Sequence, residues 1–455
     1  MSFRARRQTL HRSLGSDDGV ILWLGSTLQA RNYPANPYMP FRQDSHFLYY
    51  VGLNAPDFAA LSYPDGTEVL FGHPVDMDTI VWEGPQPSLE ERAQQAEMNQ
   101  WKDIQELPAV LKSLEKVLYL PPYQASAILK WSEWFDCSPS ACREGASKAL
   151  VEAVVQQRLV KTDDEVAEIE SALNFTADLF HAAMARTRPD APYSKLLGYL
   201  TGEIRSKLWD FSFPPILTHN GETLHIHDYD GAMEAGRLVL LDMGVETSLG
   251  YASDITRSWP VTGTFSPEQR DIYNIVLQSQ LDAIDAIKPG VPYRDVHLVA
   301  ARTIAEGLTS LGLMKGDPKA AVEAGAHALF FPHGVGHMLG GDVHDMEDLG
   351  DAVGYLPGEP RSTQFGLNFL RLARPLQEGH VVTVEPGIYF IPALFEQWRS
   401  SGQHEQFLNY DAIAPYMSFG GIRIEDDVLV TSEGQRVLGP GIAKTVEDVE
   451  ARMKG

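Results

Sequence analysis

The chain has 455 residues, more than one hydrophobic core usually organises, so two or three domains are expected. Its composition is that of a globular protein, with 44% hydrophobic and 22% charged residues, and it lacks the apolar run of about 18 residues that a membrane span requires. A net charge of −24 makes nucleic acid a poor partner, so neither nucleic acid nor membrane is an expected partner.

The N-terminus and the cysteines indicate a compartment. The basic residues Met1 to Arg7 are followed by neither an apolar core nor a small-residue cleavage site, so no secretory signal peptide is predicted. Cys137 and Cys142, the two cysteines, stand five positions apart and do not make a disulfide framework in so long a chain. A reducing cytoplasm is therefore the expected location.

Residues 1–150 are predicted to form a smaller α/β domain that precedes the rest of the chain. Helical patterns cover residues 1–14 and about 88–99. Apolar or alternating runs predict strands at 19–24, 58–63, 67–71 and 117–120. Because strands and helices alternate, an α/β arrangement is favoured.

Residues 151–455 show one order of predicted elements twice. After a helix over 148–158, the capping box of Thr162 and Glu165 opens a long helix, and another helix follows at about 193–209. Strands then dominate through Trp259.

The second pass begins at Ser266 and Pro267, an N-cap followed by proline at the first helical position. This helix extends to about residue 287, the next runs from Pro292 to about 313, and strands are predicted to fill 327–430, with a loop at 346–367. The repetition predicts an α+β domain with two similar helix–helix–strand halves around a shared sheet.

A histidine-containing stretch, Phe331 to Gly340, stands out in the second half. It places His333 and His337 four positions apart, but Pro332 and the neighbouring glycines disfavour a helix, so an extended segment is expected. The zinc-helix signature needs glutamate directly after its first histidine, and glycine stands there instead.

Four apolar or β-branched segments each carry a carboxylate where a buried charge is costly. These carboxylates are Asp242, Asp254, Glu385 and Glu425. A charge inside a buried strand costs several kcal/mol unless it is paired or binds a metal. Any one of them is explained by a salt bridge, but four such positions together with a histidine favour a metal site.

With His337, the four carboxylates make an oxygen-rich ligand set of about −4 charge, which two divalent ions neutralise. Such a set suits Mn²⁺ or Co²⁺ better than a thiolate-type zinc site, and Zn²⁺ remains an alternative. Two ions about 3.5–4 Å apart can hold a bridging hydroxide and polarise a carbonyl oxygen. The chemistry expected is hydrolysis of an amide bond.

In this order the five segments resemble the metal-binding motifs of the pita-bread metallopeptidases, which include prolidase, Xaa-Pro aminopeptidase and methionine aminopeptidase. The stretch from Phe41 to Leu48, Phe-Arg-Gln-Asp-Ser-His-Phe-Leu, resembles the N-terminal domain of the proline-specific members. The resemblance implies two divalent metal ions, proline-containing peptides as substrates, and a homodimer or higher homo-oligomer.

The resemblance also implies a role for each matching residue. Asp242 would bind one metal, Asp254 and Glu425 would bridge both, and His337 and Glu385 would complete the second. Glu385 would also shuttle a proton. His333 and His344 would contact substrate and stabilise the tetrahedral intermediate, His225 would contact substrate, and Arg423 would orient the neighbouring carboxylate. Candidates for a proline pocket are Phe211, Tyr251, His333 and Tyr389.

The stretch Leu370 to Gly379 bears on substrate length. Its Leu-Arg-x-x-Arg-x-Leu-x-x-Gly pattern resembles prolidases, in which the first arginine, here Arg371, holds the C-terminal carboxylate of a dipeptide. A guanidinium suits a carboxylate because it can donate two parallel hydrogen bonds. An Xaa-Pro dipeptidase is therefore expected, with an Xaa-Pro aminopeptidase that acts on longer peptides as the alternative.

The sequence departs from the family pattern at two places, and a different class of protein with the same fold is also an alternative. Asp242 and Asp254 are twelve positions apart where eleven is usual, and the loop 346–367 before Arg371 is long. The same fold also resembles non-catalytic peptide-binding modules and the metal-free enzyme creatinase. Those relatives are expected to replace ligand residues, whereas all five are present here.

Overall fold

The computed structural model describes residues 2–33 and 36–454, and the chain divides into two compact units. The N-terminal unit comprises residues 1–158 together with 346–352, and the C-terminal unit comprises 159–345 and 353–455. The predicted boundary at residue 150 lies inside the helix Lys148–Leu159, and the first part of the predicted loop 346–367 groups with the N-terminal unit.

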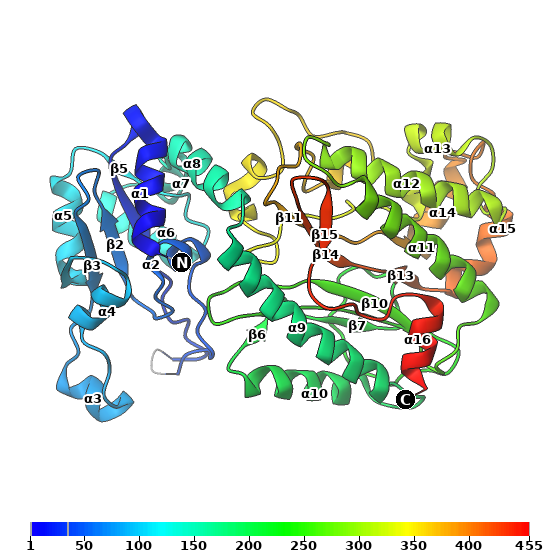
Figure 1. The fold of residues 1–455 in the computed structure, drawn as a ribbon, viewed down its shortest axis with the longest axis horizontal. Coiled ribbons are helices and arrows are strands. Elements are labelled where there is room, and N and C mark those ends of the chain that lie inside the picture. The colour runs from blue at the N-terminus through cyan, green and yellow to red at the C-terminus, as the bar shows by residue number, and fades with distance from the viewer. Residues whose placement is uncertain (1, 34–35, 455) are drawn as a thin grey trace. The chain divides into compact units, whose positions relative to one another are not determined.

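The N-terminal unit is built on one mixed sheet (Figure 1). Its strand order is β4-β3-β2-β1-β5, with β1 antiparallel to β2 and parallel to β5. The strands are β1 (Val20–Leu24), β2 (Ala59–Ser62), β3 (Glu68–Gly72), β4 (Gln100–Asp103) and β5 (Val117–Leu118). The helices are α1 (Phe3–Leu14), α2 (Ser45–Val51), α3 (Met77–Glu83), α4 (Leu89–Gln95), α5 (Leu107–Ser113), α6 (Ala125–Phe135), α7 (Pro139–Glu144) and α8 (Lys148–Leu159).

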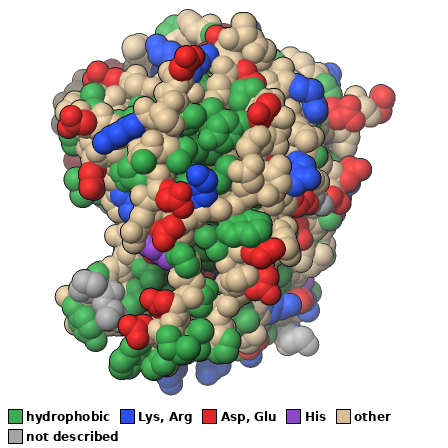
Figure 2. Space-filling model, turned by 90° about the vertical axis from the view of Figure 1, so that its left-hand side faces the viewer, with side chains coloured by type: hydrophobic (Ala, Val, Ile, Leu, Met, Phe, Trp, Pro, Cys, Tyr) green, Lys and Arg blue, Asp and Glu red, His purple; other side chains and the backbone are tan. Residues whose placement is uncertain are grey.

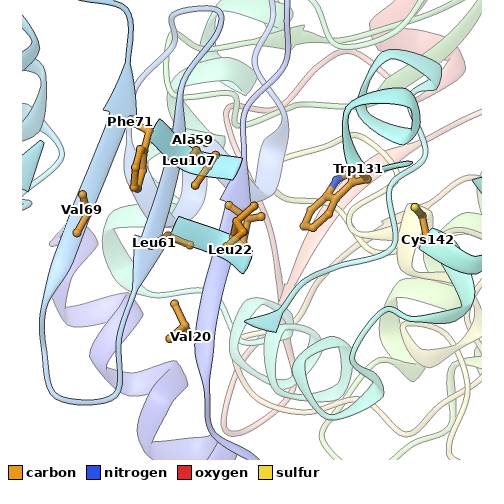
Figure 3. Close-up of a cluster of buried hydrophobic side chains, with 10 residues drawn as sticks. Val20, Leu22, Ala59, Leu61, Val69, Phe71, Leu107, Trp131 and Cys142 are labelled. Carbon is orange, nitrogen blue, oxygen red and sulfur yellow. The ribbon is translucent and has the colours of Figure 1, made fainter. Parts of the chain in front are cut away.

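Alternation along β1 gives this sheet two different faces. Val20 and Leu22 face a buried cluster with Leu61, Phe71 and Trp131 (Figure 3). On the other face, Trp23 stacks on Tyr50 at 4.1 Å between ring centroids. Because both faces bury apolar side chains, the sheet is the core of this unit.

The C-terminal unit contains the two predicted halves. The first has α9 (Asp163–Arg186), α10 (Tyr193–Ser206), β6 (Asp210–Phe211), β7 (Ile216–Thr218), β8 (Leu238–Met243), β9 (Val245–Glu246) and β10 (Ile255–Pro260). The second has α11 (Pro267–Ala286), α12 (Tyr293–Ser310), α13 (Pro318–Ala324), β11 (Val381–Val384), β12 (Gly387–Tyr389), α14 (Pro392–Ser401), α15 (Tyr410–Ile413), β13 (Gly421–Arg423), β14 (Asp426–Val430), β15 (Gln435–Val437) and α16 (Val446–Met453). Helix α9 contacts β10, and α11 contacts β11 and β13 (Figure 1).

The same hydrogen-bond pattern connects the turn in each pair of helices to the segment that precedes β8 or β11. Between α9 and α10, the amides of Asp190 and Tyr193 donate to Met233 and Gly231. One hundred residues later, between α11 and α12, the amides of Gly290 and Tyr293 donate to Leu376 and Arg374. The residue after the turn begins a helix in both cases, which confirms the repetition expected from the sequence.

The expectation that strands fill 327–430 is wrong over much of that range. The helices α14 and α15 lie within it, and α14 begins with a proline at its first turn and ends at the left-handed Gly402. Phe395 and Trp398, one helical turn apart, are its buried side chains. This helical spacing and the proline and glycine at its ends were the available signals.

Figure 2 shows acidic and basic side chains scattered among apolar ones on the face that it presents. Among the described residues, no helix has both the length and the apolar character to cross a membrane.

Candidate metal centre

Asp242 and Asp254 are placed by the antiparallel pair β8 and β10. Asp242 lies in β8 opposite Thr256 of β10, and Asp254 directly precedes β10. The segment between the two aspartates contains β9 and a turn that Gly250 closes by donating its amide to the carbonyl of Thr247. The paired register of β8 and β10 is continuous from Met243 and Ile255 to Leu238 and Pro260.

Glu385 and Glu425 are placed in the same way in the second half. Glu385 directly follows β11, and Glu425 directly precedes β14, its antiparallel neighbour. The Glu425 amide donates to the carbonyl of Thr256 in the first half, and its carboxylate accepts a 2.7 Å hydrogen bond from the Thr256 hydroxyl. These bonds join the carboxylates of the two halves.

His337 lies on a segment that runs beside β11 without forming a regular strand. The amide of Thr383 donates to the His337 carbonyl, and the amide of Glu385 donates to that of Val335. This extended path matches the sequence-based expectation. His337 Nδ1 lies 3.0 Å from the Met338 carbonyl, and donation there leaves Nε2 as the nitrogen with a free lone pair.

Asp254, His337 and Glu425 converge. Each offers one ligand atom, and these three atoms lie within 4.8 Å of one another. His337 Nε2 lies 3.4 Å from an Asp254 oxygen and 3.8 Å from a Glu385 oxygen. Asp242 also belongs to this group, because its charge raises the pKa of Asp254. The five predicted ligand residues are therefore brought together.

The cluster holds more negative charge than its surroundings compensate. Burial, and after it the neighbouring carboxylates, raises the pKa of Asp254 and of Glu425 well above the ordinary range. Burial raises the pKa of Glu385 to about 7, although His337 and Arg423 act in the opposite direction. Asp242, Asp254 and Glu425 are each at most 8% exposed.

The donor set fits divalent cations. One buried oxygen of Asp242 and one of Asp254 have no hydrogen-bond partner within the described structure. Buried carboxylate oxygens normally have partners, so atoms of this kind indicate positions where a cation belongs. Oxygen ligands with one imidazole also suit Mn²⁺-like ions.

Both units match known protein families. Residues 167–432 match metallopeptidase family M24, and residues 3–119 match the N-terminal domain of aminopeptidase P. The chain belongs to metallopeptidase family M24. A probable Xaa-Pro aminopeptidase of Fusarium vanettenii is 33% identical over 421 residues, which cover 90% of this chain and 87% of that protein. Another, of Pyrenophora tritici-repentis, is 32% identical over 447 residues, covering 96% and 92%.

Solved structures of this kind superpose over the whole chain. Pseudomonas aeruginosa aminopeptidase PepP has a TM-score of 0.82 and 30% identity, covering 99% of this chain and 97% of that one. A glutamate-to-alanine variant of Escherichia coli aminopeptidase P, in complex with substrate, has a TM-score of 0.81 and 27% identity, covering 100% of this chain and 98% of that one. The expected α+β pita-bread fold with a preceding N-terminal domain is confirmed, and the relatives named above are aminopeptidases rather than dipeptidases.

The cluster of Asp242, Asp254, His337, Glu385 and Glu425 is called the M24 centre below. A chain of hydrogen bonds extends from its carboxylates toward His333. Arg423 lies 2.5 Å from an Asp242 oxygen and also donates to the Thr256 hydroxyl and the Tyr389 oxygen. The Tyr389 oxygen lies 2.8 Å from His333 Nε2. Arg423 therefore contacts Asp242 directly and reaches Glu425, the neighbouring carboxylate that the sequence predicted it to orient, through the Thr256 hydroxyl, while Tyr389 connects it to His333.

Three other predicted residues lie around the M24 centre. The rings of His344 and His337 contact each other at 4.2 Å between centroids. Burial, and then the charges of His337 and Arg371, lowers the pKa of His344 to about 2, so its ring is neutral at neutral pH. Burial and Arg423 lower the pKa of His225, and Arg371 adds to this effect. Arg371 itself is exposed and near enough to influence both histidines.

Some residues of the M24 centre were not identified from the sequence. Thr256 contacts both Glu425 and Arg423, and Asp427 accepts a 3.0 Å hydrogen bond from the amide of Asp254. The Glu-Asp-Asp run 425–427 was a signal for Asp427, since alternate residues of a strand share a face. Tyr251, a candidate for the proline pocket, is instead buried, with its hydroxyl 2.9 Å from Glu165.

Proposed function

We propose that this metallopeptidase is an Xaa-Pro aminopeptidase, which removes the residue before proline from the N-terminus of a peptide. The supporting observation is that relatives named Xaa-Pro aminopeptidase align along both units, at 33% identity over 90% of the chain in one case. The carboxylate and histidine cluster supports the hydrolytic chemistry.

In the proposed site, Asp242, Asp254, His337, Glu385 and Glu425 hold two divalent ions. When bound, such ions acidify a water molecule and polarise the scissile carbonyl. Glu385 is the proposed proton carrier, because its carboxylate lies within the cluster, 3.8 Å from His337 Nε2, where it can reach a water molecule held there. Arg423 fixes one oxygen of Asp242 and so directs the other toward the cluster.

Neutral histidines complete the proposed mechanism. Burial lowers the pKa of His333 to about 3, with Arg423 acting in the same direction, and the pKa of His344 is about 2. A neutral imidazole has one N–H to donate. Both ring nitrogens of His333 already have partners, the Gly334 carbonyl at 2.7 Å and the Tyr389 oxygen at 2.8 Å, so His344 is the proposed hydrogen-bond donor to the oxygen of the tetrahedral intermediate. His225 is the third proposed substrate contact, at an exposed position near Arg423.

An Xaa-Pro dipeptidase is the second candidate, and Arg371 is the observation that favours it. Its positive charge reaches His225, His333 and His344, so it lies where a substrate carboxylate can be held. We place this candidate below the aminopeptidase, because the relatives carry the other activity in their names.

Matched substrates distinguish the two candidates. Hydrolysis of Ala-Pro and of Ala-Pro-Ala is measured with Mn²⁺ after chelation and reloading, for the native protein and for Arg371→Ala. The aminopeptidase cleaves the tripeptide at least as fast as the dipeptide. Cleavage confined to the dipeptide and lost in Arg371→Ala would establish the dipeptidase. No cleavage of either, with metal bound, would exclude both.

Three finer features belong to the same proposal. Mn²⁺ is the proposed metal, tested by comparing activity restored by Mn²⁺, Co²⁺ and Zn²⁺ after chelation. A homo-oligomer is proposed, and light scattering gives its mass. One apolar surface that such an assembly would cover is on α3, where Met77, Val81 and Trp82 are exposed. The proposed cytoplasmic location is tested by cell fractionation.

A further inference from the structure

The two cysteines of the chain meet in the N-terminal unit. Cys137 follows α6, and Cys142 lies within α7, the next helix. Their Sγ atoms are 2.6 Å apart, and both residues carry free thiols in this structure. A disulfide bond requires two sulfurs within a short covalent distance and side chains directed at each other, so these two thiols need little movement to bond.

The backbone holds this pair in place. Asp136 adopts a left-handed conformation at the end of α6, and the amide of Cys137 donates to the carbonyl of Ser132. Ser138 caps α7, accepting from the amide of Ala141, and the amide of Cys142 donates to the Ser138 carbonyl. The approach of the sulfurs follows from a helix–turn–helix that has its own hydrogen bonds.

The two thiols have different surroundings. Cys142 is 1% exposed and belongs to the apolar cluster that contains Trp131 (Figure 3). Its carbonyl accepts a 3.1 Å hydrogen bond from the hydroxyl of Tyr119, whose ring packs on Trp131. Cys137 is half-buried at the edge of that cluster, so it is the thiol that a reagent in solution reaches.

We propose that Cys137 and Cys142 form a reversible intrachain disulfide, a redox modification site in the N-terminal unit. In the first step, the thiolate of Cys137 attacks a low-molecular-weight disulfide such as glutathione disulfide, which releases one glutathione thiol. Cys142 then attacks the mixed disulfide, the intrachain S–S bond forms, and the second glutathione leaves. Two protein thiols are oxidised and one glutathione disulfide is reduced to two thiols.

The surroundings of Cys137 set the pace of this exchange. The Cys142 thiol, followed by burial, raises the pKa of Cys137 to about 11, so few molecules carry the thiolate at neutral pH. Because exchange is slow, a brief exposure to an oxidant leaves both thiols reduced. Over longer times, the ratio of glutathione to glutathione disulfide determines whether the disulfide forms. The residues of the M24 centre belong to the other unit, so the bridge uses none of them.

The test is equilibration of the full-length protein in buffers of varied glutathione to glutathione disulfide ratio. Samples are quenched in acid, alkylated, and analysed by intact mass and peptide mapping. The expected result is a cooperative change from two alkylated thiols to none, with Cys137 and Cys142 in one cross-linked peptide, reversed by added thiol. Reoxidised protein is also expected to melt no lower than the reduced protein, because closing a short loop restricts the unfolded chain.

The variants Cys137→Ser and Cys142→Ser are the controls, since neither can form the bridge. Cys137→Ser is expected to take up little glutathione, because its remaining thiol is buried, whereas Cys142→Ser takes up one glutathione. The proposal fails if both native thiols stay alkylatable in excess glutathione disulfide. It also fails if the native protein ends with glutathione on Cys137, or if the cross-link joins two chains.

Discussion

Two adjacent carboxylates, Glu425 and Asp426, face opposite sides of one strand and meet opposite environments. Burial would raise the pKa of Asp426, but Arg257 and Lys444 overcome this and lower it to about 2. Their nitrogens lie 2.6 Å from its oxygens. Glu425 receives one hydroxyl, from Thr256, and its pKa is raised well above the ordinary range.

This difference distinguishes a carboxylate that the chain's own cations neutralise from one that a bound metal ion would neutralise. On the Asp426 side, the chain itself supplies the cations, and the carboxylate is ionised at all ordinary pH values. On the Glu425 side lie the carboxylates of Asp242, Asp254 and Glu385, and Arg423 donates a hydrogen bond to Asp242. A buried cluster with this balance is stable when it is protonated or when divalent cations neutralise it.

The largest effect is expected from Glu385→Gln. Because the amide cannot carry a proton between water and the leaving group, peptide hydrolysis should fall about 10²- to 10⁴-fold. Steady-state rates on Ala-Pro-Ala with saturating Mn²⁺ measure this. The exposed Glu378→Gln, close in sequence, serves as the control and should stay near the native rate. A Glu385→Gln rate within threefold of native would remove Glu385 from the proposed proton transfer.

The next effect is on the compensated side. Asp426→Ala leaves the buried guanidinium of Arg257 without its carboxylate, which is expected to cost about 3–5 kcal/mol in the free energy of unfolding. Urea titration measures the loss. The matched control is Asp411→Ala, which breaks the solvent-exposed ion pair with Arg399 and should cost about 1 kcal/mol or less. Equal losses in the two variants would contradict the comparison.

A change of opposite sign is expected on the uncompensated side. In metal-free protein at pH 8, Glu425→Gln should raise the free energy of unfolding, because burial and the neighbouring carboxylates raise the pKa of Glu425 and make its ionised form unfavourable in the folded protein. The neutral amide removes a charge from the cluster and can still accept from Thr256. Melting curves with and without Mn²⁺ test this, because the metal-loaded variant should lose the advantage. A metal-free variant less stable than native would show that the cluster is already compensated.

The smallest expected effect is the pH dependence of the metal-free protein. A carboxyl group whose pKa is raised on folding binds more protons in the folded state, so stability falls as pH rises. The fall should begin near the ordinary carboxyl pKa, about 4.5, and continue through about 7, the value for Glu385. Thermal midpoints recorded from pH 5 to 8 measure it, and added Mn²⁺ should flatten the curve. A midpoint that rises over this range in the absence of metal would contradict the assignment.

Much of the fold could be predicted because local rules and packing agree. The capping box of Thr162 and Glu165 and the proline at 267 start helices where the sequence indicated. The prediction that strands fill residues 327–430 was wrong because the β-branched residues before Glu385 favour strands, and that preference was extended to the rest of the range. Phe395 and Trp398, at helical spacing, were the local signal for α14.

The candidate site likewise contains residues that the sequence could identify and residues that it could not. The five predicted ligand residues could be identified as a set, because four carboxylates in apolar segments together with a histidine are unusual, whereas any one of them is explained by a salt bridge. Thr256 and Asp427 could not be identified, since their importance lies in contacts across strands far apart in the sequence. Cys137 and Cys142 are a similar case, because their spacing does not reveal that a left-handed Asp136 turns one sulfur toward the other.

The turns one hundred residues apart are matched in their backbone but not in what their tyrosines reach. The hydroxyl of Tyr193 lies 3.0 Å from His219, whereas that of Tyr293 donates to the carbonyl of Thr383. Thr383 also accepts from the amide of His337 through its hydroxyl. One copy of the repeated turn thus supports the histidine-bearing segment, whereas the tyrosine of the other copy contacts His219. A repeat of this kind keeps the same backbone hydrogen bonds in both halves, while the side chains of each half make different contacts.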